Sequence, residues 1–179
     1  MNSTASSFKT DRLLLRPFAA NDLDAYHAMA SDPEVVRFLG EGKPLSRADA
    51  WRHLAIFLGT WQLRGYGTWA MEDLASGVFV GRVGFIHPEG WPGVELSWAL
   101  SRPFWGSGLA TEAARACLEN GFLVSGFSHV ISLIHPENQR SIGLAKRLGE
   151  SYEGSTEIFG HPALIYGIKH PSPVPTRGS

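Results

Sequence analysis

Two glycines near the middle of the chain mark a place where a phosphate could bind. Gly106 and Gly108 lie in the run from Arg102 to Ala113, between an expected strand and an expected helix. Glycine lets the backbone turn tightly and lets a ligand approach the amides closely. The free N–H groups of a helix's first turn, together with the helix dipole, attract anions. This segment therefore predicts a site for a phosphate-bearing compound.

The two common nucleotide-binding loops do not fit this segment. A Walker loop places Lys and then Ser or Thr after its last glycine, where Leu109 and Ala110 stand here. A Rossmann fingerprint needs glycine or alanine where Thr111 stands, and it opens the first βαβ unit of its domain. Taken alone, the two glycines are equally typical of an ordinary tight turn before a helix.

The first half of the chain predicts a short strand and two helices. Leu13 to Leu15 form a buried strand that ends at a proline, and Asn21 can cap a helix that runs to Met29. Ser46 can cap the second helix. Its apolar residues recur at spacings of three and four and predict one buried face, made of Trp51, Leu54, Leu58 and Trp61.

The second half predicts a sheet with crossing helices. Strand-like runs over 68–71, 78–86 and 94–100 are separated by turn residues and predict an antiparallel meander. Because a helix that crosses between two strands makes them parallel, a parallel pair should lie within residues 94–134. The remaining elements follow in order: helix 109–122, strand 129–134, helix 141–148 and a closing hairpin within 156–168.

The composition argues against several classes of protein. The 179 residues suffice for one domain with a sizeable core, and 44% of them are hydrophobic. Sixteen basic and seventeen acidic residues give a net charge of −1, so no nucleic-acid partner is expected. A lone cysteine, Cys117, and three histidines beside prolines without ligand spacing predict no metal site. No signal peptide or membrane span is recognisable, so the expected location is cytoplasmic, without a membrane partner.

A second segment, from His135 to Gly149, completes a family pattern. Together the two segments resemble the Gcn5-related N-acetyltransferases (GNAT), and most closely the branch that acetylates the N-termini of ribosomal proteins. The shared elements are an aromatic followed by W-G-x-G, then A-T-E-A, then N-x-x-S with a terminal L-G, found here at Phe104 to Gly108, Ala110 to Ala113 and Asn138 to Gly149. Thr10 to Pro17 and Asp32 to Val35 resemble the start of that branch.

The resemblance implies a single α/β (mixed α+β) domain over residues 8–169, with flexible termini at 1–7 and 170–179. Its sheet would be mixed and mostly antiparallel, with six or seven strands, a parallel splayed central pair and about four flanking helices. The implied reaction moves the acetyl group of acetyl-CoA to a primary amine, on a protein N-terminus or a small molecule, directly in a ternary complex and without a metal. An exposed sheet edge could also support a homodimer.

The resemblance further implies which residues hold acetyl-CoA. The backbone of the glycine segment would bind the pyrophosphate, and the preceding strand would bind the pantetheine arm together with the side chain of Asn138. Ser141 would lie near the thioester sulfur. The implied residues are Trp98, Ala99, Leu100, Trp105, Gly106, Ser107, Gly108, Leu109, Ala110, Asn138 and Ser141.

Three residues are candidates for catalysis. Glu95, on the strand that leads to the glycine turn, is the first candidate for the general base, directly or through a water; the alternative is an ordinary solvated carboxylate. Glu157 is the second candidate, with a surface role as its alternative. Ser141 can donate a hydrogen bond to the departing sulfur or simply cap its helix.

Two departures from the wider superfamily leave alternatives open. Pro103 stands where Gln or Arg is frequent, and Ala145 stands where many relatives have a general-acid tyrosine. The missing tyrosine leaves a non-catalytic acetyl-CoA-binding regulatory module as an alternative to an enzyme. An acyltransferase that uses another acyl-CoA is a further alternative.

Overall fold

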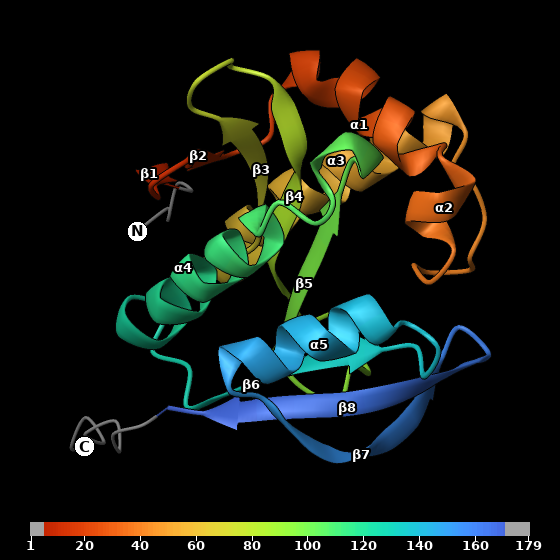
Figure 1. The fold of residues 1–179 in the computed structure, drawn as a ribbon, viewed down its shortest axis with the longest axis vertical. Coiled ribbons are helices and arrows are strands. Elements are labelled where there is room, and N and C mark those ends of the chain that lie inside the picture. Colours follow the sequence, from red (N-terminus) through yellow and green to blue (C-terminus); the bar gives the residue numbers. More distant parts are fainter. Residues whose placement is uncertain (1–5, 171–179) are drawn as a thin grey trace.

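One eight-stranded sheet organises the part of the chain that the computed structural model describes, residues 6–170 (Figure 1). Its strand order is β1-β2-β3-β4-β5-β6-β8-β7, and neighbouring strands are antiparallel except for β5 and β6. The strands are β1 Phe8–Lys9, β2 Leu13–Arg16, β3 Thr68–Asp73, β4 Phe79–Ile86, β5 Glu95–Leu100, β6 His129–Ile134, β7 Ser151–Ile158 and β8 His161–Lys169.

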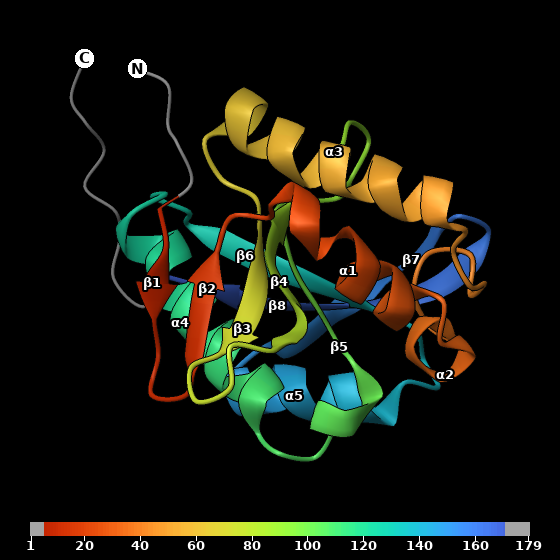
Figure 2. The ribbon, with the colours of Figure 1, turned by 90° about the horizontal axis from the view of Figure 1, so that it is seen from above.

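Helices cover both faces of the sheet (Figure 2). On one face lie α1 and α3, whose Tyr26 and Phe57 pack in a cluster with Ala99 of β5. On the other face lie α4 and α5, whose Cys117 and Leu144 pack in the larger cluster. The helices are α1 Leu23–Ala30, α2 Pro33–Val36, α3 Arg47–Arg64, α4 Leu109–Leu123 and α5 Gln139–Leu148, with short 3₁₀ turns at Ala20–Asp22 and Arg102–Phe104.

The pair β5–β6 is the point at which the sheet opens. β4 pairs with β5 from Ile86–Glu95 to Gly81–Leu100, but β5 and β6 share one register pair, Glu95 opposite Ile131. Beyond that pair the two strands separate. Because α4 crosses from the end of β5 to the start of β6, the two strands run parallel and their diverging ends lie at the same edge. The predicted parallel, splayed central pair is confirmed.

The counts of strands and helices exceed the prediction of six or seven strands and about four helices. The additional strand is β1, two residues long, and the additional helix is α2, a single turn capped by the Asp32 side chain. Elements this short carry no readable periodicity. The closing hairpin also begins earlier than predicted, at Ser151, because Gly154 and a register shift interrupt the expected alternation along β7.

The predicted face of α3 is partly wrong. Trp51 is 60% exposed and Leu58 is 46% exposed, whereas Ala50, Leu54 and Phe57 are buried. Ala50 and Phe57 each precede a predicted residue, Trp51 or Leu58, by one position, which is about 100° around the helix. Leu54 is buried as predicted. The predicted N-cap is confirmed, because the Ser46 side chain accepts a hydrogen bond from the amide of Asp49 at 3.1 Å.

The predicted flexible termini fall mostly on residues 1–5 and 171–179, which lie outside the described residues. At the ends of the described part, the Ser6 carbonyl accepts a hydrogen bond from Trp69 Nε1 at 3.0 Å, and the His170 amide donates to the Ser128 carbonyl at 2.9 Å. None of the helices within residues 6–170 has the length and apolar character needed to cross a membrane.

Candidate active site

The glycine segment folds as a tight turn that leads directly into α4. Gly106 and Gly108 have φ angles of 76° and 84°, a region that side-chain-bearing residues rarely adopt. The first intrahelical bond runs from the Glu112 amide to the Gly108 carbonyl at 3.1 Å. The amides of Leu109, Ala110 and Thr111 therefore have no acceptor within the helix. These donors and the positive end of α4 are the features that the predicted anion site requires.

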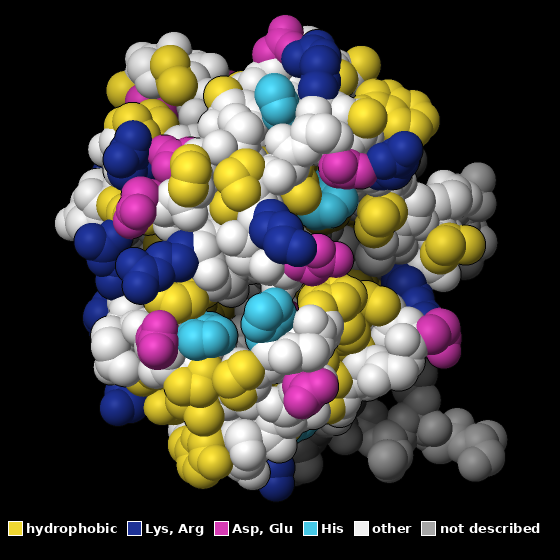
Figure 3. Space-filling view, turned by 90° about the vertical axis from the view of Figure 1, so that its right-hand side faces the viewer, with side chains coloured by type: hydrophobic (Ala, Val, Ile, Leu, Met, Phe, Trp, Pro, Cys, Tyr) yellow, Lys and Arg dark blue, Asp and Glu magenta, His cyan; other side chains and the backbone are white. Residues whose placement is uncertain are grey.

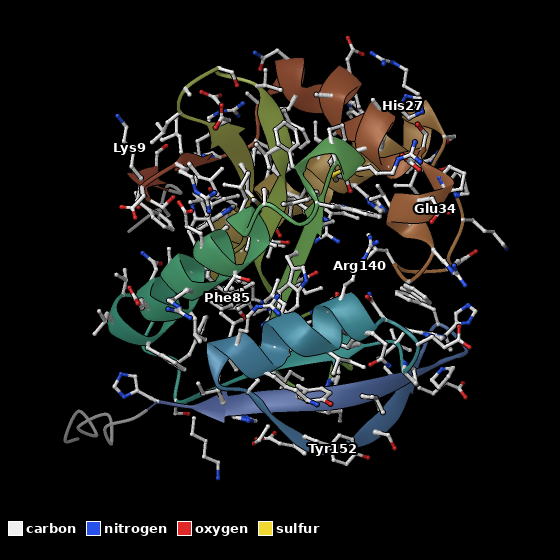
Figure 4. All side chains as sticks on the ribbon, in the orientation of Figure 1. Lys9, His27, Glu34, Phe85, Arg140 and Tyr152 are labelled. Atoms are coloured by element: carbon white, nitrogen blue, oxygen red, sulfur yellow. The ribbon has the colours of Figure 1, made fainter. Side chains whose placement is uncertain are left out.

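Trp105, at the start of this turn, has a different role from the implied one, which was to bind the pyrophosphate through its backbone. The Trp105 amide already donates to the Arg102 carbonyl at 3.1 Å, so it is not available to a phosphate. Its indole Nε1 donates to the Leu100 carbonyl at 2.8 Å and thereby ties the turn to the end of β5. Arg140, in the first turn of α5, lies over the Trp105 ring at 4.7 Å from its centroid (Figure 4). That contact brings a cation to the glycine turn.

The N-terminal strands hold the turn from its other side. Arg12 donates through Nη1 to the Ser107 carbonyl at 3.0 Å and through Nε to Glu112 at 2.7 Å. Thr10 Oγ1 donates to the same carboxylate at 2.5 Å. Burial favours the uncharged form of Glu112, but the hydrogen bonds from Thr10 and Arg12 outweigh it and lower the pKa of this carboxyl. Glu112 is thus an anchor for the turn. Beside it lies an open hollow of about 670 Å³, lined by residues that include Gly108, Arg115 and Arg147.

A small cavity of about 50 Å³ lies where β5 and β6 diverge. Trp98 and Ser97 of β5 line it from one side, Asn138 and Ser141 of α5 from another, and Phe38 from the loop after α2. It is lined in addition by Leu39, Glu95, Leu96, Ser132, Leu133, Ile134 and His135. The structure thus brings together four of the residues that the sequence singles out, from elements far apart in the chain.

Strand alternation decides which backbone groups of β5 reach this opening. The Val94 and Leu96 carbonyls accept bonds from Ile131 and Ser132 of β6, so alternate residues, including Trp98 and Leu100, direct their backbone groups to that side. The Ala99 carbonyl faces β4 instead, because it lies 2.2 Å from where a Cβ of Gly81 would stand. Of the three residues implied to bond the pantetheine arm, Ala99 is therefore placed wrongly for that contact.

Two side chains of α5 are held at the mouth of the cavity. Asn138 caps the helix, with Oδ1 accepting from the Ser141 amide at 3.2 Å, which leaves its amide nitrogen free to meet a ligand. Ser141 lies in the first turn rather than at the cap. Its hydroxyl accepts from Trp98 Nε1 at 3.3 Å, so its own hydrogen can be donated to another group. Ala145, at the place of the missing tyrosine, is fully buried.

Glu95 is a buried carboxyl, 7% exposed, and not the solvated strand residue of the alternative interpretation. Trp91 Nε1 donates to its Oε2 at 2.6 Å. Burial raises the pKa of Glu95 to about 7, although the Trp91 hydrogen bond, the charge of Arg82 and a backbone bond from Leu133 each oppose that rise. A carboxyl with this pKa exchanges a proton near neutral pH, as a general base must.

Glu157 does not join this group. It lies on the exposed side of the β7–β8 hairpin, opposite Pro162, and does not line the cavity between β5 and β6. The histidines also stay apart: within residues 6–170, no three of the His, Cys, Asp and Glu side chains are grouped so that they could hold a metal ion.

A second buried carboxyl, which sequence reasoning missed, lies beside the opening. Glu150 is 4% exposed, and its Oε1 accepts from Ser132 Oγ at 3.0 Å. Its Oε2 is buried and has no hydrogen-bond partner among the described residues. Burial raises the pKa of Glu150 to about 8; the Ser132 bond lowers it, and the charges of Glu153 and Glu95 raise it. The only available signal was its position directly after the terminal L-G.

The outer surface next to α2 and the β7–β8 turn carries no continuous patch of like charge among the described residues (Figure 3). Figure 3 shows acidic, basic and histidine side chains interspersed with apolar ones on that face. Two ion pairs illustrate the mixture, Arg102 with Asp32 at 3.1 Å and Arg64 with Glu89. Charge recognition must therefore come from individual side chains near the opening.

The chain has extensive similarity to known acetyltransferases. The family model described as an acetyltransferase (GNAT) domain matches residues 12–150. The uncharacterized protein YkkB of Bacillus subtilis (strain 168) is 31% identical over 168 residues, which cover 89% of this chain and 94% of YkkB.

Solved structures agree with that similarity. An acetyltransferase from Agrobacterium tumefaciens str. C58 has a TM-score of 0.83 at 27% identity and covers 93% of this chain and 96% of its own. RimL, a ribosomal L7/L12 alpha-N-protein acetyltransferase whose structure contains coenzyme A, has a TM-score of 0.77 at 18% identity, covering 92% and 98%, and so shares the fold. The resemblance found in the sequence motifs is confirmed: the chain belongs to the GNAT family of acetyltransferases.

Proposed function

We propose that this acetyltransferase moves the acetyl group of acetyl-CoA to a primary amine by direct transfer in a ternary complex. The observation that carries the proposal is the position of Glu95, a buried carboxyl at the point where β5 and β6 diverge. Ser141, Asn138 and the backbone of Trp98 lie around the same cavity. A proton acceptor and a polar wall for a thioester are thereby combined in one small space.

The residues proposed to hold acetyl-CoA form a continuous path. Amides from Gly106 to Ala110 bind the pyrophosphate, and Arg12 and Arg140 add positive charge on either side of the turn. The backbone groups of Trp98 and Leu100 that face β6, with the Asn138 amide, bind the pantetheine arm.

Glu95 is proposed to act as the general base. An α-amine has a pKa of about 8, so transfer of its proton to a carboxylate with a pKa near 7 is close to balanced. The neutral amine then attacks the thioester carbonyl, the C–N bond forms and the C–S bond breaks, and the proton that the attacking nitrogen loses passes to the sulfur of the departing CoA. The thiolate leaves with a hydrogen bond from the Ser141 hydroxyl. The exposed position of Glu157 gives no support to a role for it in this step.

Binding and turnover together test the proposal. At acetyl-CoA one hundred times above its Kd, the free energy of unfolding should rise by about 2.7 kcal/mol, which corresponds to a Tm increase of roughly 5 to 10 °C for this chain length. CoA should produce a similar rise, and NAD and ATP should not. Release of CoA in the presence of an amine panel then separates an enzyme from a non-catalytic acetyl-CoA-binding module. A chain without any Tm rise at saturating acetyl-CoA would refute the donor site.

A further inference from the structure

An arginine that forms no salt bridge with any described residue lies beside the opening between β5 and β6. Arg82 of β4 donates through Nη1 to Ser97 Oγ at 3.0 Å, and Ser97 lines the cavity. Arg82 and Ser97 are diagonal neighbours on adjacent strands, and Gly84, directly opposite Ser97, has no side chain to separate them. The guanidinium therefore lies behind Ser97 and is joined to this wall of the cavity by one hydrogen bond.

The other neighbours of Arg82 are uncharged. Its guanidinium lies over the Phe57 ring at 5.8 Å from the centroid, and it interacts with the Tyr26 hydroxyl, which is also bonded to His53 Nδ1 at 3.0 Å. Burial raises the pKa of Tyr26, and burial followed by the charge of Arg82 lowers the pKa of His53. Both side chains are thus neutral at pH 7.

No carboxylate within residues 6–170 forms a salt bridge with Arg82. Arg16 on the neighbouring part of the sheet provides the contrast, because it is bonded to both Asp22 and Glu72 at 2.8 Å. The positive charge of Arg82 lowers the pKa of Glu95, which lies at the proposed site of reaction. A half-buried cation normally has a partner, since its desolvation is otherwise not compensated.

We propose that Arg82, with Ser97, binds an anionic group that the acceptor molecule carries close to its amine. This inference rests on the proposed function and specifies the substrate class of the same site: amines with a nearby carboxylate, in place of simple amines or polyamines. The carboxylate accepts a hydrogen bond from the Ser97 hydroxyl, and the guanidinium behind Ser97 supplies the positive charge on the α1 and α3 side of the sheet. The amine is then left next to Glu95 at the divergence of the strands.

Matched acceptors that differ in one carboxylate test this inference. Alanylalanine is compared with alanylalaninamide, and a Ser-Asp peptide amide with its Ser-Asn counterpart, by release of CoA from acetyl-CoA; spermidine serves as the polycation. Since a hydrogen bond to a charged group is worth about 1.5 to 3 kcal/mol, the carboxylate acceptors should have a kcat/KM about tenfold to a hundredfold higher. A preference in the first pair identifies a free carboxyl terminus, and one in the second an acidic side chain.

Variants assign the preference to Arg82. R82Q should abolish the preference through an increased KM, R82K should keep part of it, and R52Q, on the exposed side of α3, should keep all of it. The Tm rise with acetyl-CoA must survive in each variant, which shows that folding and the donor site are intact. Equal kcat/KM for both members of each pair, a preference for spermidine, or an unchanged preference in R82Q would overturn the inference while the proposed function stands.

If none of these acceptors is acetylated, the binding of an acetylated product still tests the inference. N-acetylalanylalanine should bind the CoA-saturated protein in calorimetry, and R82Q should bind it about tenfold or more weakly. No binding to the native protein, or equal binding to R82Q, refutes the anion site. Failure of the proposed function itself is distinguishable, because it appears as the absence of any Tm rise with acetyl-CoA.

Discussion

At the scale of single residues, the proposed chemistry depends on a carboxyl group that the fold keeps from water. Glu95 lies in the strand pair that holds the sheet together, so its burial follows from the topology and is not a local accident. The same burial that raises its pKa to about 7 also removes competing solvent hydrogen bonds. The Trp91 indole donates to one carboxylate oxygen, and a backbone bond from Leu133 also holds the group in place.

Replacing Glu95 with glutamine tests this role directly. Loss of a general base lowers rates by about 10²- to 10⁴-fold, so E95Q should lose at least about a hundredfold in kcat/KM at pH 7 while its Tm still rises with acetyl-CoA. In the native protein kcat/KM should increase as the pH rises through about 7, because Glu95 becomes ionised. That limb should vanish in E95Q. The control is E157Q, which should behave like the native protein; the opposite result would move the base to Glu157.

Gly108 is the residue at which a ligand role and a turn role can be separated. Its φ of 84° strains any side chain, and a Cβ there would point to the phosphate site beside Arg12. G108V should weaken acetyl-CoA binding by far more than it lowers the free energy of unfolding. Gly126 is the matched control, since its φ is 71° and nothing lies within 4 Å of its Cβ position. G126V should show the loss of stability alone; equal effects of both variants on binding would make Gly108 a turn residue only.

The glycine turn and the helix start of α4 could be derived from neighbours within a few positions of the chain. Asn138 was instead implied as a contact to the pantetheine arm, and Ser141 was the expected cap, whereas the structure has Asn138 as the N-cap of α5. The roles of Arg12, Arg82, Arg140 and Glu150 come from contacts between distant segments, such as the Arg12–Glu112 pair, and one sequence without relatives does not reveal such pairs. The bond between Trp91 and Glu95 could not be predicted for a related reason, because Glu95 is buried only through the β5–β6 pairing.

At the scale of elements, α4 approaches the sheet closely near its C-terminal end. Gly121 faces Phe85 of β4, whose ring would be 2.4 Å from a Cβ at position 121; Figure 4 labels Phe85 below α4. A glycine inside a helix otherwise costs about 0.5 to 1 kcal/mol relative to alanine. Its presence here is explained by the space that Phe85 occupies.

Alanine substitutions in two helices separate packing from helix propensity. G121A should lower the free energy of unfolding by about 1 to 3 kcal/mol, because the added methyl overpacks the core against Phe85. G59A in α3, where nothing lies within 4 Å of the Cβ position, should raise it by about 0.5 to 1 kcal/mol. Urea unfolding measures both values. A gain of stability in G121A would show that α4 can move away from the sheet without cost.

The elements that were predicted well are those with long, regular patterns. The predicted bounds of β4, β5 and β6 differ from the observed bounds by at most one residue. Each of these strands has an alternating or continuously apolar pattern between clear turn signals. The face of α3 was misjudged at two positions because apolar residues occur all around that helix. Ala50 and Phe57 compete with Trp51 and Leu58 for the core, while Leu54 is buried as predicted. Only the position of the sheet beneath the helix decides between the two faces.

At the scale of the whole molecule, the sheet consists of two parts that meet at β5 and β6. The strands β1 to β5 form an antiparallel unit, and β6, β8 and β7 form another, with α4 as the crossing connection. The site is built where these units are least tightly joined, so the backbone groups that leave the ladder become available to a substrate. Ser132 bridges the two units by donating to the Leu96 carbonyl at 3.1 Å and to Glu150. The fold class was predictable because the order of elements allows few other sheets; the site's polar interior was not.

The two buried carboxyls at this junction make the stability of the whole molecule depend on pH. Glu95 and Glu150 have pKa values raised to about 7 and about 8, above the value of 4.5 for a free glutamate. A raised pKa means that the folded state binds more protons, so the stability it contributes is fully present below pH 4.5 and is lost as the pH rises through 7 to 8. The free energy of unfolding should therefore fall between about pH 5 and pH 8.5, as urea titrations at several pH values would show.

Glutamine at position 150 should remove part of that slope. Near pH 5 the native Glu150 is protonated and resembles glutamine, so E150Q should differ little from the native protein. At about pH 8.5 the native carboxylate is charged, buried and unpaired at Oε2, and E150Q should be more stable by roughly 2 to 4 kcal/mol. E119Q, on the exposed side of α4, should leave the slope unchanged. Parallel pH curves for E150Q and the native protein would mean that solvent reaches the junction, and Glu95 would then be no more protected from water than its neighbour.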